Sequence, residues 1–231
     1  MQAVVSPADA IAGEVFGTQP SISVFDSKGI LAVELSGYVY AEMGVSPVEY
    51  EPLWLGECNV TSCGTQVEYD MARVTLNNGI ADFKDMNLQI RRAGSGYTLR
   101  FITVNAFGSP IAFTFSDEFD VALGDPYTLA LDPNMGHVQG GLPFDIQPSV
   151  VITDRGGNIV TSVDEGNAYV DLYRSPFPNE VLHTTETRMA TFNGGTAQFE
   201  GLYLNKVGGP YELIFNTSLV SFFHPYLFCV K

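Results

Sequence analysis

Two stretches of this 231-residue chain repeat one another, and this repeat limits the possible folds more than any other feature. Residues 13–29 and 141–157 share seven identical residues at a constant offset of 128. The shared positions include the run Gln-Pro-Ser and later an aspartate and a glycine. Identity in one register over this length indicates that the chain contains two copies of one structural unit.

A second pair of segments supports the duplication. Residues 79–101 and 195–215 share glycine, leucine and aromatic positions, first at an offset of 116 and then of 114. In this alignment Leu88 matches Leu204. The smaller offset means that the first copy holds about a dozen more residues, and insertions of this kind belong in loops. We expect the inserted loop at about residues 44–66.

The pattern of apolar residues predicts strands rather than helices. Alternation of apolar and polar residues is present at residues 22–26, 150–154 and 169–173, and it is typical of half-buried strands. Asn78-Gly79 and Gly156-Gly157 supply residues that favour tight hairpin turns. Units of about 100 residues with many short strands fit two antiparallel sheets packed face to face. The prediction is an all-β chain of two tandem immunoglobulin-like β-sandwich domains.

The boundary between the two predicted domains is placed at Gly124. Domain one then covers 1–124, with the inserted loop, and domain two covers 125–231. The connection between them is short, because Tyr127 already begins the first expected strand of the second copy. A short connection favours a stiff arrangement of consecutive units over freely jointed ones.

The longer motifs resemble a known family. Residues 144–158 read Phe-x-x-Gln-Pro-x-Val-x-Ile-x-Asp-x-x-Gly-Asn, residues 195–204 read Gly-x-Ala-x-Phe-x-x-Leu-x-Leu, and residues 209–215 read Gly-x-Tyr-x-Leu-x-Phe. These motifs resemble the immunoglobulin-like repeats of large extracellular arrays, which include bacterial invasin-like adhesins and filamin-type repeats. The resemblance covers nearly the whole chain.

The resemblance implies a role and a location. It implies structural or adhesive spacer repeats at the cell surface, whose partners are neighbouring repeats of the same long chain and also other surface proteins or glycans. The start of the chain lacks the basic residues and long apolar centre of a secretory signal. We therefore expect this sequence to be a segment of a longer tandem array.

Charge and hydropathy exclude two classes of partner. The chain has 11 Lys and Arg residues against 26 Asp and Glu residues, a net charge of -15, which would repel a phosphate backbone. We therefore expect no nucleic-acid partner. The longest apolar stretch, residues 219–230, is shorter than the roughly 20 residues that a spanning helix needs. We expect no membrane insertion by this segment.

The closely spaced cysteines Cys58 and Cys63 lie in the expected loop. Their spacing favours a local disulfide, which would stiffen the loop and contribute about 2 kcal/mol to stability. Two free thiols and half of a four-ligand zinc site remain alternatives, although further ligands nearby are sparse. Cys229 stands among apolar residues and is interpreted as a buried free thiol.

Two sites match the rule for N-linked glycosylation, at Asn59 and at Asn216. Both fall in an expected turn or at a strand end, where a glycan could project. One or two such matches also arise by accident in a chain rich in Asn, Ser and Thr. The glycoprotein hypothesis is supported by the cysteine pair, which favours an oxidising compartment.

Tyr97 and Tyr211 each follow a pair of glycines and precede alternating leucine and phenylalanine. This pattern is typical of the corner in which a buried tyrosine hydroxyl bonds a nearby main-chain group. Both tyrosines are therefore interpreted as structural.

Four acidic residues lie near the predicted domain boundary: Asp117, Glu118, Asp120 and Asp125. Carboxylates that converge near a linker are candidate calcium ligands. The alternative is that they are solvated, since the chain is acidic throughout and has no loop of regularly spaced calcium ligands. No other metal and no organic cofactor is expected.

The sequence contains no recognisable catalytic motif, and we expect no enzyme activity. The alternative to a spacer is a glycan- or protein-binding module in the first domain. Its candidate ligand contacts are Tyr50, Trp54 and Tyr69, because exposed aromatic rings can stack on sugars or anchor a protein. The competing interpretation is that these residues cap an open end of the sandwich.

Overall fold

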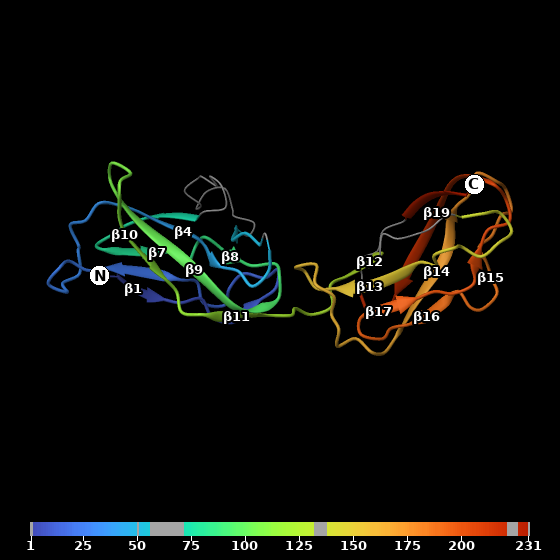
Figure 1. Ribbon diagram of the computed structural model, residues 1–231, viewed down its shortest axis with the longest axis horizontal. Helices are drawn as coiled ribbons and strands as arrows, with labels where there is room; N and C mark the ends of the chain where they lie inside the picture. Colours follow the sequence, from blue (N-terminus) through green and yellow to red (C-terminus); the bar gives the residue numbers. More distant parts are fainter. Residues whose placement is uncertain (1, 50, 56–71, 132–137, 221–225, 231) are drawn as a thin grey trace. The chain divides into compact units, whose positions relative to one another are not determined.

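The computed structural model describes residues 2–49, 51–55, 72–131, 138–220 and 226–230. These residues form strands connected by turns and loops, and the described part of the chain contains no helix (Figure 1). The prediction of an all-β chain is confirmed. No described segment forms a helix that is long and apolar enough to cross a membrane.

The chain divides into two compact units. Unit 1 comprises residues 1–124 with 156–158, and unit 2 comprises residues 125–155 with 159–231. The strands of unit 1 are β1 (Gln2–Val5), β2 (Ala10–Ile11), β3 (Ser21–Val24), β4 (Gly37–Val45), β5 (Trp54–Leu55), β6 (Ala72–Thr75), β7 (Ile80–Asp82), β8 (Leu88–Gln89), β9 (Gly94–Asn105), β10 (Pro110–Phe115) and β11 (Phe119–Ala122). The strands of unit 2 are β12 (Thr128–Leu131), β13 (Ser149–Thr153), β14 (Asn167–Arg174), β15 (His183–Thr184), β16 (Met189–Thr191), β17 (Thr196–Gln198), β18 (Leu202–Tyr203), β19 (Gly208–Thr217) and β20 (Tyr226–Val230).

Both units are sandwiches of two sheets. In unit 1 one sheet has the order β1-β3-β7, and the other has the order β2-β11-β9-β4-β6 with β10 also on β9. In unit 2 the orders are β12-β13-β17 and β16-β14-β19-β20. This distribution of consecutive strands between two sheets is that of an immunoglobulin-like sandwich. The predicted fold of each copy is therefore observed.

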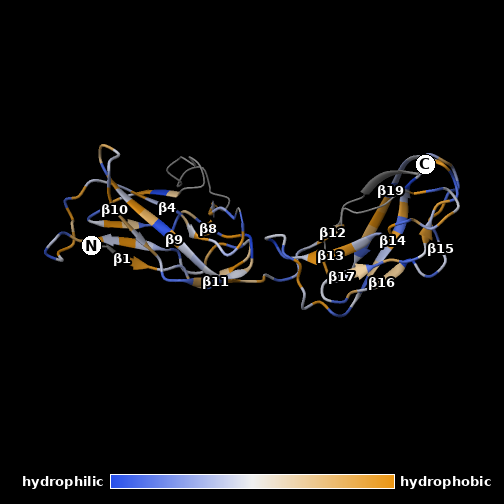
Figure 2. Ribbon diagram, in the orientation of Figure 1, coloured by the Kyte–Doolittle hydropathy of each residue, from blue (hydrophilic) through white to orange (hydrophobic). Residues whose placement is uncertain are grey.

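Alternation along the long strands builds each core. In β9 the side chains of Tyr97, Leu99 and Phe101 are fully buried and the intervening Arg100 is partly exposed, so the strand contains both hydrophobic and hydrophilic residues (Figure 2). Phe101 contacts Phe83 of the opposite sheet, with ring centroids 5.7 Å apart. The corresponding rings of unit 2, Phe215 and Phe199, are 5.5 Å apart. The same aromatic pair therefore bridges the two sheets in each unit.

A glutamine side chain closes the same edge of both sandwiches. The Gln19 amide donates to the Phe16 and Leu88 carbonyls and accepts a bond from the Leu88 amide at 3.0 Å. In unit 2, Gln147 makes the same three bonds to Phe144 and Leu202. Each glutamine side chain thus supplies a donor and an acceptor to the main chain of Leu88 or Leu202, as a neighbouring strand would.

These bonds correct the alignment of the two copies. Leu88 occupies the position of Leu202, so its match to Leu204 was wrong. Ile90 is the residue that corresponds to Leu204, because the carbonyls of both accept a bond from a repeated glycine, Gly13 or Gly141. The offset changes between β7 and β8, where the first copy has two additional residues in the connecting turn. Leucine at alternate positions made the shifted alignment look equally good.

The position of the insertion is also corrected. Between β4 and β5 lie residues 46–53, and between β14 and β15 lie residues 175–182, two connections of equal length. Apart from the two in the β7–β8 turn, the extra residues of the first copy therefore fall between β5 and β6, at 56–71 rather than at 44–66. The longer repeats did not locate this position, because β5 and β15 share no identical residue.

Candidate functional site

Several candidate residues lie outside the described part of the chain. They are Tyr50, Cys58, Asn59, Cys63 and Tyr69. The disulfide, the first glycosylation site and two of the three candidate ligand contacts therefore stay predictions. Trp54 is the candidate ligand contact whose surroundings the structure describes.

Trp54 belongs to a small two-stranded sheet. It pairs with Gln89, as part of the antiparallel pair β5–β8. Unit 2 has the same small sheet, in which β15 pairs with β18 and His183 lies opposite Tyr203. Trp54 therefore occupies a framework position that is present in both units.

One face of the Trp54 ring is already covered. The guanidinium carbon of Arg91 lies 3.7 Å from the centroid of the indole ring, within the range of a cation–π contact. In unit 2 the residues at these two positions are His183 and Asn205, whose ring and amide nitrogens lie 2.9 Å apart, while the ring of His183 stacks on Tyr203 with centroids 5.1 Å apart. A sugar could stack on this face of Trp54 only by displacing Arg91.

A buried glutamate fixes the loop that carries Arg91. Glu51 is 9% exposed, and its carboxylate accepts bonds from the main-chain amides of Arg91 at 2.7 Å and Arg92 at 3.3 Å. In unit 2 the carboxylate of Glu180 accepts a bond from the Asn205 amide at 2.9 Å. The loop of unit 1 follows β8 and leads directly into β9, and the loop of unit 2 follows β18 and leads directly into β19.

A buried tyrosine holds the same loop from the other side. The Tyr97 hydroxyl donates to the Arg92 carbonyl at 2.8 Å, and the Tyr211 hydroxyl donates to the Lys206 carbonyl at 2.7 Å. Both tyrosine side chains are completely buried. Each loop is therefore fixed at an amide by a carboxylate and at a carbonyl by a phenol. We call this arrangement the loop clamp.

Sequence reasoning missed the glutamates of the loop clamp. A signal for them existed, because Ser-Pro-x-x-x-Glu begins at Ser46 and again at Ser175, at an offset of 129. The serines also act alike, since the Ser46 hydroxyl accepts a bond from the Val48 amide and the Ser175 hydroxyl accepts one from Phe177. The motif is short and lies outside the longer repeats, so it was not recognised.

The clamp raises the pKa of both tyrosines. Burial of the phenol, which disfavours the charged form, is the main reason that the pKa of Tyr97 lies above its ordinary value. The negative charge of Glu51 raises it further, whereas Arg92 lowers it. Burial followed by the charge of Glu180 raises the pKa of Tyr211 in the same way.

The acidic residues near the boundary accept hydrogen bonds from different donors. The Asp117 carboxylate accepts a bond from the Ser6 hydroxyl at 3.1 Å, and Asp120 accepts one from the Gly96 amide at 3.2 Å. Within the described ranges, no three His, Cys, Asp or Glu side chains are grouped so as to hold a metal ion. Two of the four candidate calcium ligands thus bond to donors of unit 1.

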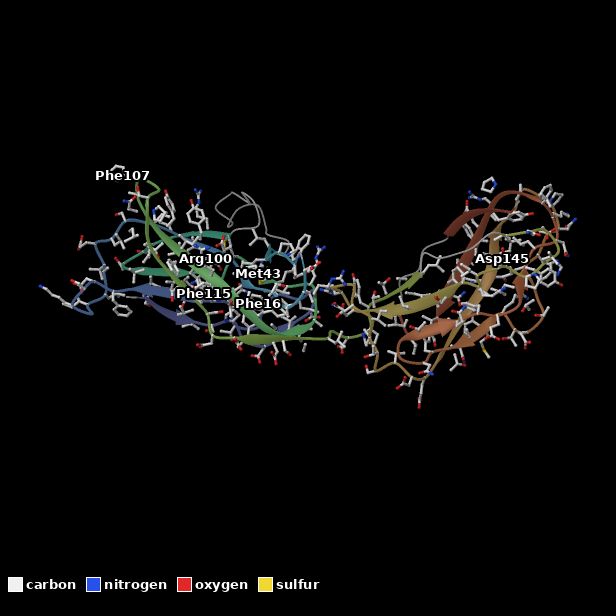
Figure 3. The ribbon with its side chains drawn as sticks, viewed as in Figure 1. Phe16, Met43, Arg100, Phe107, Phe115 and Asp145 are labelled. Carbon is white, nitrogen blue, oxygen red and sulfur yellow. The ribbon has the colours of Figure 1, made fainter. Side chains whose placement is uncertain are left out.

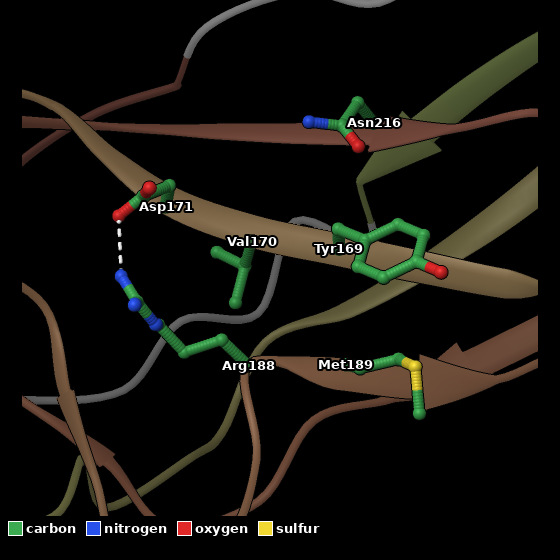
Figure 4. A pocket seen from close by; sticks show the side chains of 6 residues that line it. All are labelled: Tyr169, Val170, Asp171, Arg188, Met189 and Asn216. Atoms are coloured by element: carbon green, nitrogen blue, oxygen red, sulfur yellow. Dashed lines mark hydrogen bonds and ion pairs between the residues drawn. The ribbon is translucent and has the colours of Figure 1, made fainter.

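Asn216 lies on the outer face of unit 2. It is exposed, stands opposite Tyr169 in the β14–β19 pair, and borders a surface hollow of about 350 Å³. An ion pair of 2.8 Å between Asp171 and Arg188 closes one side of the hollow (Figure 4). The residues lining the hollow are Tyr169, Val170, Asp171, Arg188, Met189 and Asn216.

Comparison with known proteins gives only distant likenesses. No family model matches the chain, and no curated protein matches it. A solved structure of the D00-D0 domain of Intimin matches with 13% identity and a TM-score of 0.40, over 100% of both chains. The Escherichia coli adhesin FdeC matches with 16% identity and a TM-score of 0.34, over 100% of this chain and 64% of that one.

An enzyme is matched at the same level. A beta-glycosidase from Bacteroides vulgatus has 10% identity and a TM-score of 0.37, and this chain spans only 24% of its length. Likenesses of this kind assign neither a family nor an activity. The description of the fold therefore depends on the strand order and core given above.

The carboxylate of the loop clamp is expected to stabilise each unit separately. Glu51→Ala leaves two main-chain amides without their charged acceptor and is expected to destabilise unit 1 by about 2 to 3 kcal/mol. Glu180→Ala is expected to act on unit 2 alone. Differential scanning calorimetry of the full chain measures both transitions. Glu49→Ala, which removes an exposed carboxylate nearby, is the control, and an equal effect of this change would contradict the assignment.

The raised pKa values predict a loss of stability in alkali. The unfolded tyrosine ionises near pH 10.0, while the folded one stays protonated to higher pH. Above pH 10 the unfolded chain therefore holds fewer protons than the folded one, and the stability that each clamp tyrosine contributes falls until the folded tyrosine also ionises. Tyr97→Phe should be less stable than the parent at pH 8, and the difference should shrink by pH 11.

Chemical denaturation at a series of pH values measures this difference. Tyr169→Phe, at a tyrosine that is 44% exposed, is the matched control. A difference between parent and Tyr97→Phe that stays constant from pH 8 to pH 11 would show that the buried phenol does not titrate later than the unfolded one.

Proposed function

We propose that the two units are structural spacer modules from the extracellular part of a larger cell-surface protein. The observation that supports this most directly is that the loop clamp and the glutamine closure are built twice with the same bonds. A duplicated framework maintains a fixed module rather than one specialised cleft. The motif resemblance to extracellular immunoglobulin-like repeats points the same way, and it suggests neighbouring repeats, surface proteins and glycans as partners.

The strand pairing of unit 1 is suited to bearing load. Strand β2, near the start of unit 1, pairs in parallel with β11, near the end of the unit. Val121 lies opposite Ala10, and Ala122 lies opposite Ile11. The Ala12 amide adds a bond of 2.9 Å to the Ala122 carbonyl. Force applied to the two ends of the unit would shear these bonds together rather than open them one after another. Terminal strands that resist shear are what a spacer under tension requires.

Unit 2 differs at the corresponding place. Its counterpart of β2, residues 138–139, forms no strand, and its last strand, β20, pairs only with β19 among the described strands. We therefore propose that unit 1 is the mechanically stronger module.

Pulling the chain by its two ends tests the spacer role. Single-molecule force spectroscopy should show two separate unfolding events, each adding about 30 to 40 nm of chain at roughly 0.35 nm per residue. Unit 1 should unfold at the higher force. Ala122→Pro removes a donor from the β2–β11 pair and should lower the force of that event alone, with unit 2 of the same molecule as the internal control.

Two other outcomes would contradict the proposal. A single event containing the whole chain would mean that the units do not work as separate modules. Two events with a stronger unit 1 that Ala122→Pro leaves unchanged would mean that the terminal pair does not bear the load.

We also propose that Asn216 carries an N-linked glycan. The side chain is exposed on the outer face of β19, at the border of the hollow, so an attached sugar has room. When the chain is secreted from eukaryotic cells, Asn216→Gln should remove one endoglycosidase-sensitive shift in electrophoretic mobility. Asn193→Gln, outside any glycosylation motif, is the control. Equal mobility of parent and Asn216→Gln before enzyme treatment would refute the assignment.

A further inference from the structure

Strand β10 forms an exposed edge of unit 1. It pairs with β9 along one side, with Phe113 opposite Ile102 and Phe115 opposite Arg100. Among the described strands, none pairs with its other side, although β1 of the other sheet lies beside it and the Asp117 amide, just beyond the end of β10, donates to the Ser6 hydroxyl. An edge strand presents main-chain donors and acceptors to any extended segment that approaches it.

The register shows which main-chain groups are exposed. The Ser116 amide donates to the Leu99 carbonyl at 2.9 Å, so Ser116 is directed toward β9. Residues with this direction alternate in an antiparallel ladder, which includes Thr114 and Ala112. The amides and carbonyls of Phe113 and Phe115 consequently point away from β9, toward the open edge.

The side chains on this edge are large, apolar and exposed. Phe113 is 64% exposed and Phe115 is 47% exposed, and their ring centroids are 6.1 Å apart. Ile111 is 50% exposed, and Phe107 at the tip of the β9–β10 hairpin is 94% exposed (Figure 3). We call these four side chains and the β10 main chain the apolar edge.

The apolar edge lacks the usual protection of an edge strand. Charged residues commonly prevent such strands from pairing with other chains. The opposite edge of the same sheet, β6, contains Arg73, whereas residues 106–116 contain no charged residue in a chain of net charge -15. Pro110 and a bulge protect only the start of β10. Its centre at Phe113 is left open.

We propose that the apolar edge pairs with the apolar edge of a second copy of this chain. Two identical strands can pair in antiparallel fashion about a two-fold axis, so that each copy supplies both the donors and the acceptors. Two acidic molecules also approach at lower electrostatic cost where the charges are few and paired: Arg100, whose guanidinium carbon lies 5.5 Å from the Phe113 ring centroid, forms an ion pair of 3.2 Å with Glu42. Both conditions favour a second copy over an acidic or basic partner. This self-association is independent of the proposed spacer role.

The size of the apolar edge predicts the strength of the contact. A fully covered phenylalanine buries roughly 200 Å², so the exposed parts of the four side chains amount to about 500 Å² per copy. Two copies together then bury about 1,000 Å², which is at the lower end of specific interfaces. The structure therefore predicts a weak, reversible dimer rather than an obligate one.

Sedimentation equilibrium of the 231-residue chain tests the pairing. Between about 1 µM and 1 mM, the weight-average mass should rise from 25.1 kDa toward twice that value, and added salt should favour the dimer by screening net charge. Phe113→Lys should weaken association at least tenfold. Val207→Lys, which adds the same charge at a site 62% exposed in unit 2, should leave it unchanged. Constant monomer mass, or equal effects of both variants, would overturn the proposal.

Two further measurements separate strand pairing from simple apolar contact. Phe113→Pro removes both the ring and the outward amide, whereas Phe113→Ala removes only the ring, so Pro should weaken the dimer more. In the parent chain, hydrogen exchange of the Phe113 and Phe115 amides should slow as the concentration rises. Unchanged exchange across the monomer–dimer transition would overturn the strand pairing, whether or not the proline variant folds.

Discussion

The loop clamp is the interaction on which the rest of each unit depends. The loop at residues 90–93 connects the small sheet that ends one side of the sandwich to β9, the central strand of the larger sheet. Its amides are fixed by Glu51 and its Arg92 carbonyl by Tyr97, so the position at which β9 begins is determined from two sides. Burying a carboxylate is unfavourable unless it is fully bonded. The clamp meets this condition with main-chain amides, which no side-chain movement can withdraw.

Once β9 and β19 are fixed at their first residues, alternation determines the rest of the core. A shift by one residue would turn Leu99 and Phe101 to the solvent, so the register is strongly specified. The glutamine closure joins the strand just before each clamp loop, β8 or β18, to the segment before β3 or β13, and the proline after each glutamine contributes an acceptor. The Pro20 carbonyl accepts a bond from the Phe83 amide, and the Pro148 carbonyl accepts one from Phe199. Framework and core are therefore connected through the residues that the two copies share.

The sequence was sufficient to predict features that are marked by alternation of apolar and polar residues or by a long run of identities between the two copies. The strands, the two-copy fold and the buried setting of Tyr97 all belong to this class. It was insufficient where a contact joins residues far apart without a shared motif, as in the stacking of Arg91 on Trp54 or the bonds of Glu51. It also failed at Leu88, because alternate leucines permit two alignments and only the bonds of Gln19 distinguish them.

The framework does not constrain the side chains on the outer faces. The outer face of β14 in unit 2 carries Tyr169 and Asp171, the latter paired with Arg188 just before β16, and β10 of unit 1 presents two phenylalanines. Neither set of side chains contributes to the core, so folding does not dictate their identity. Exposed phenylalanines reduce solubility and are not required by the fold, and exposed apolar side chains that gather in a patch commonly mark an interaction site. The shared framework therefore accounts for the module, whereas the side chains that it leaves unconstrained are the ones free to contact other molecules.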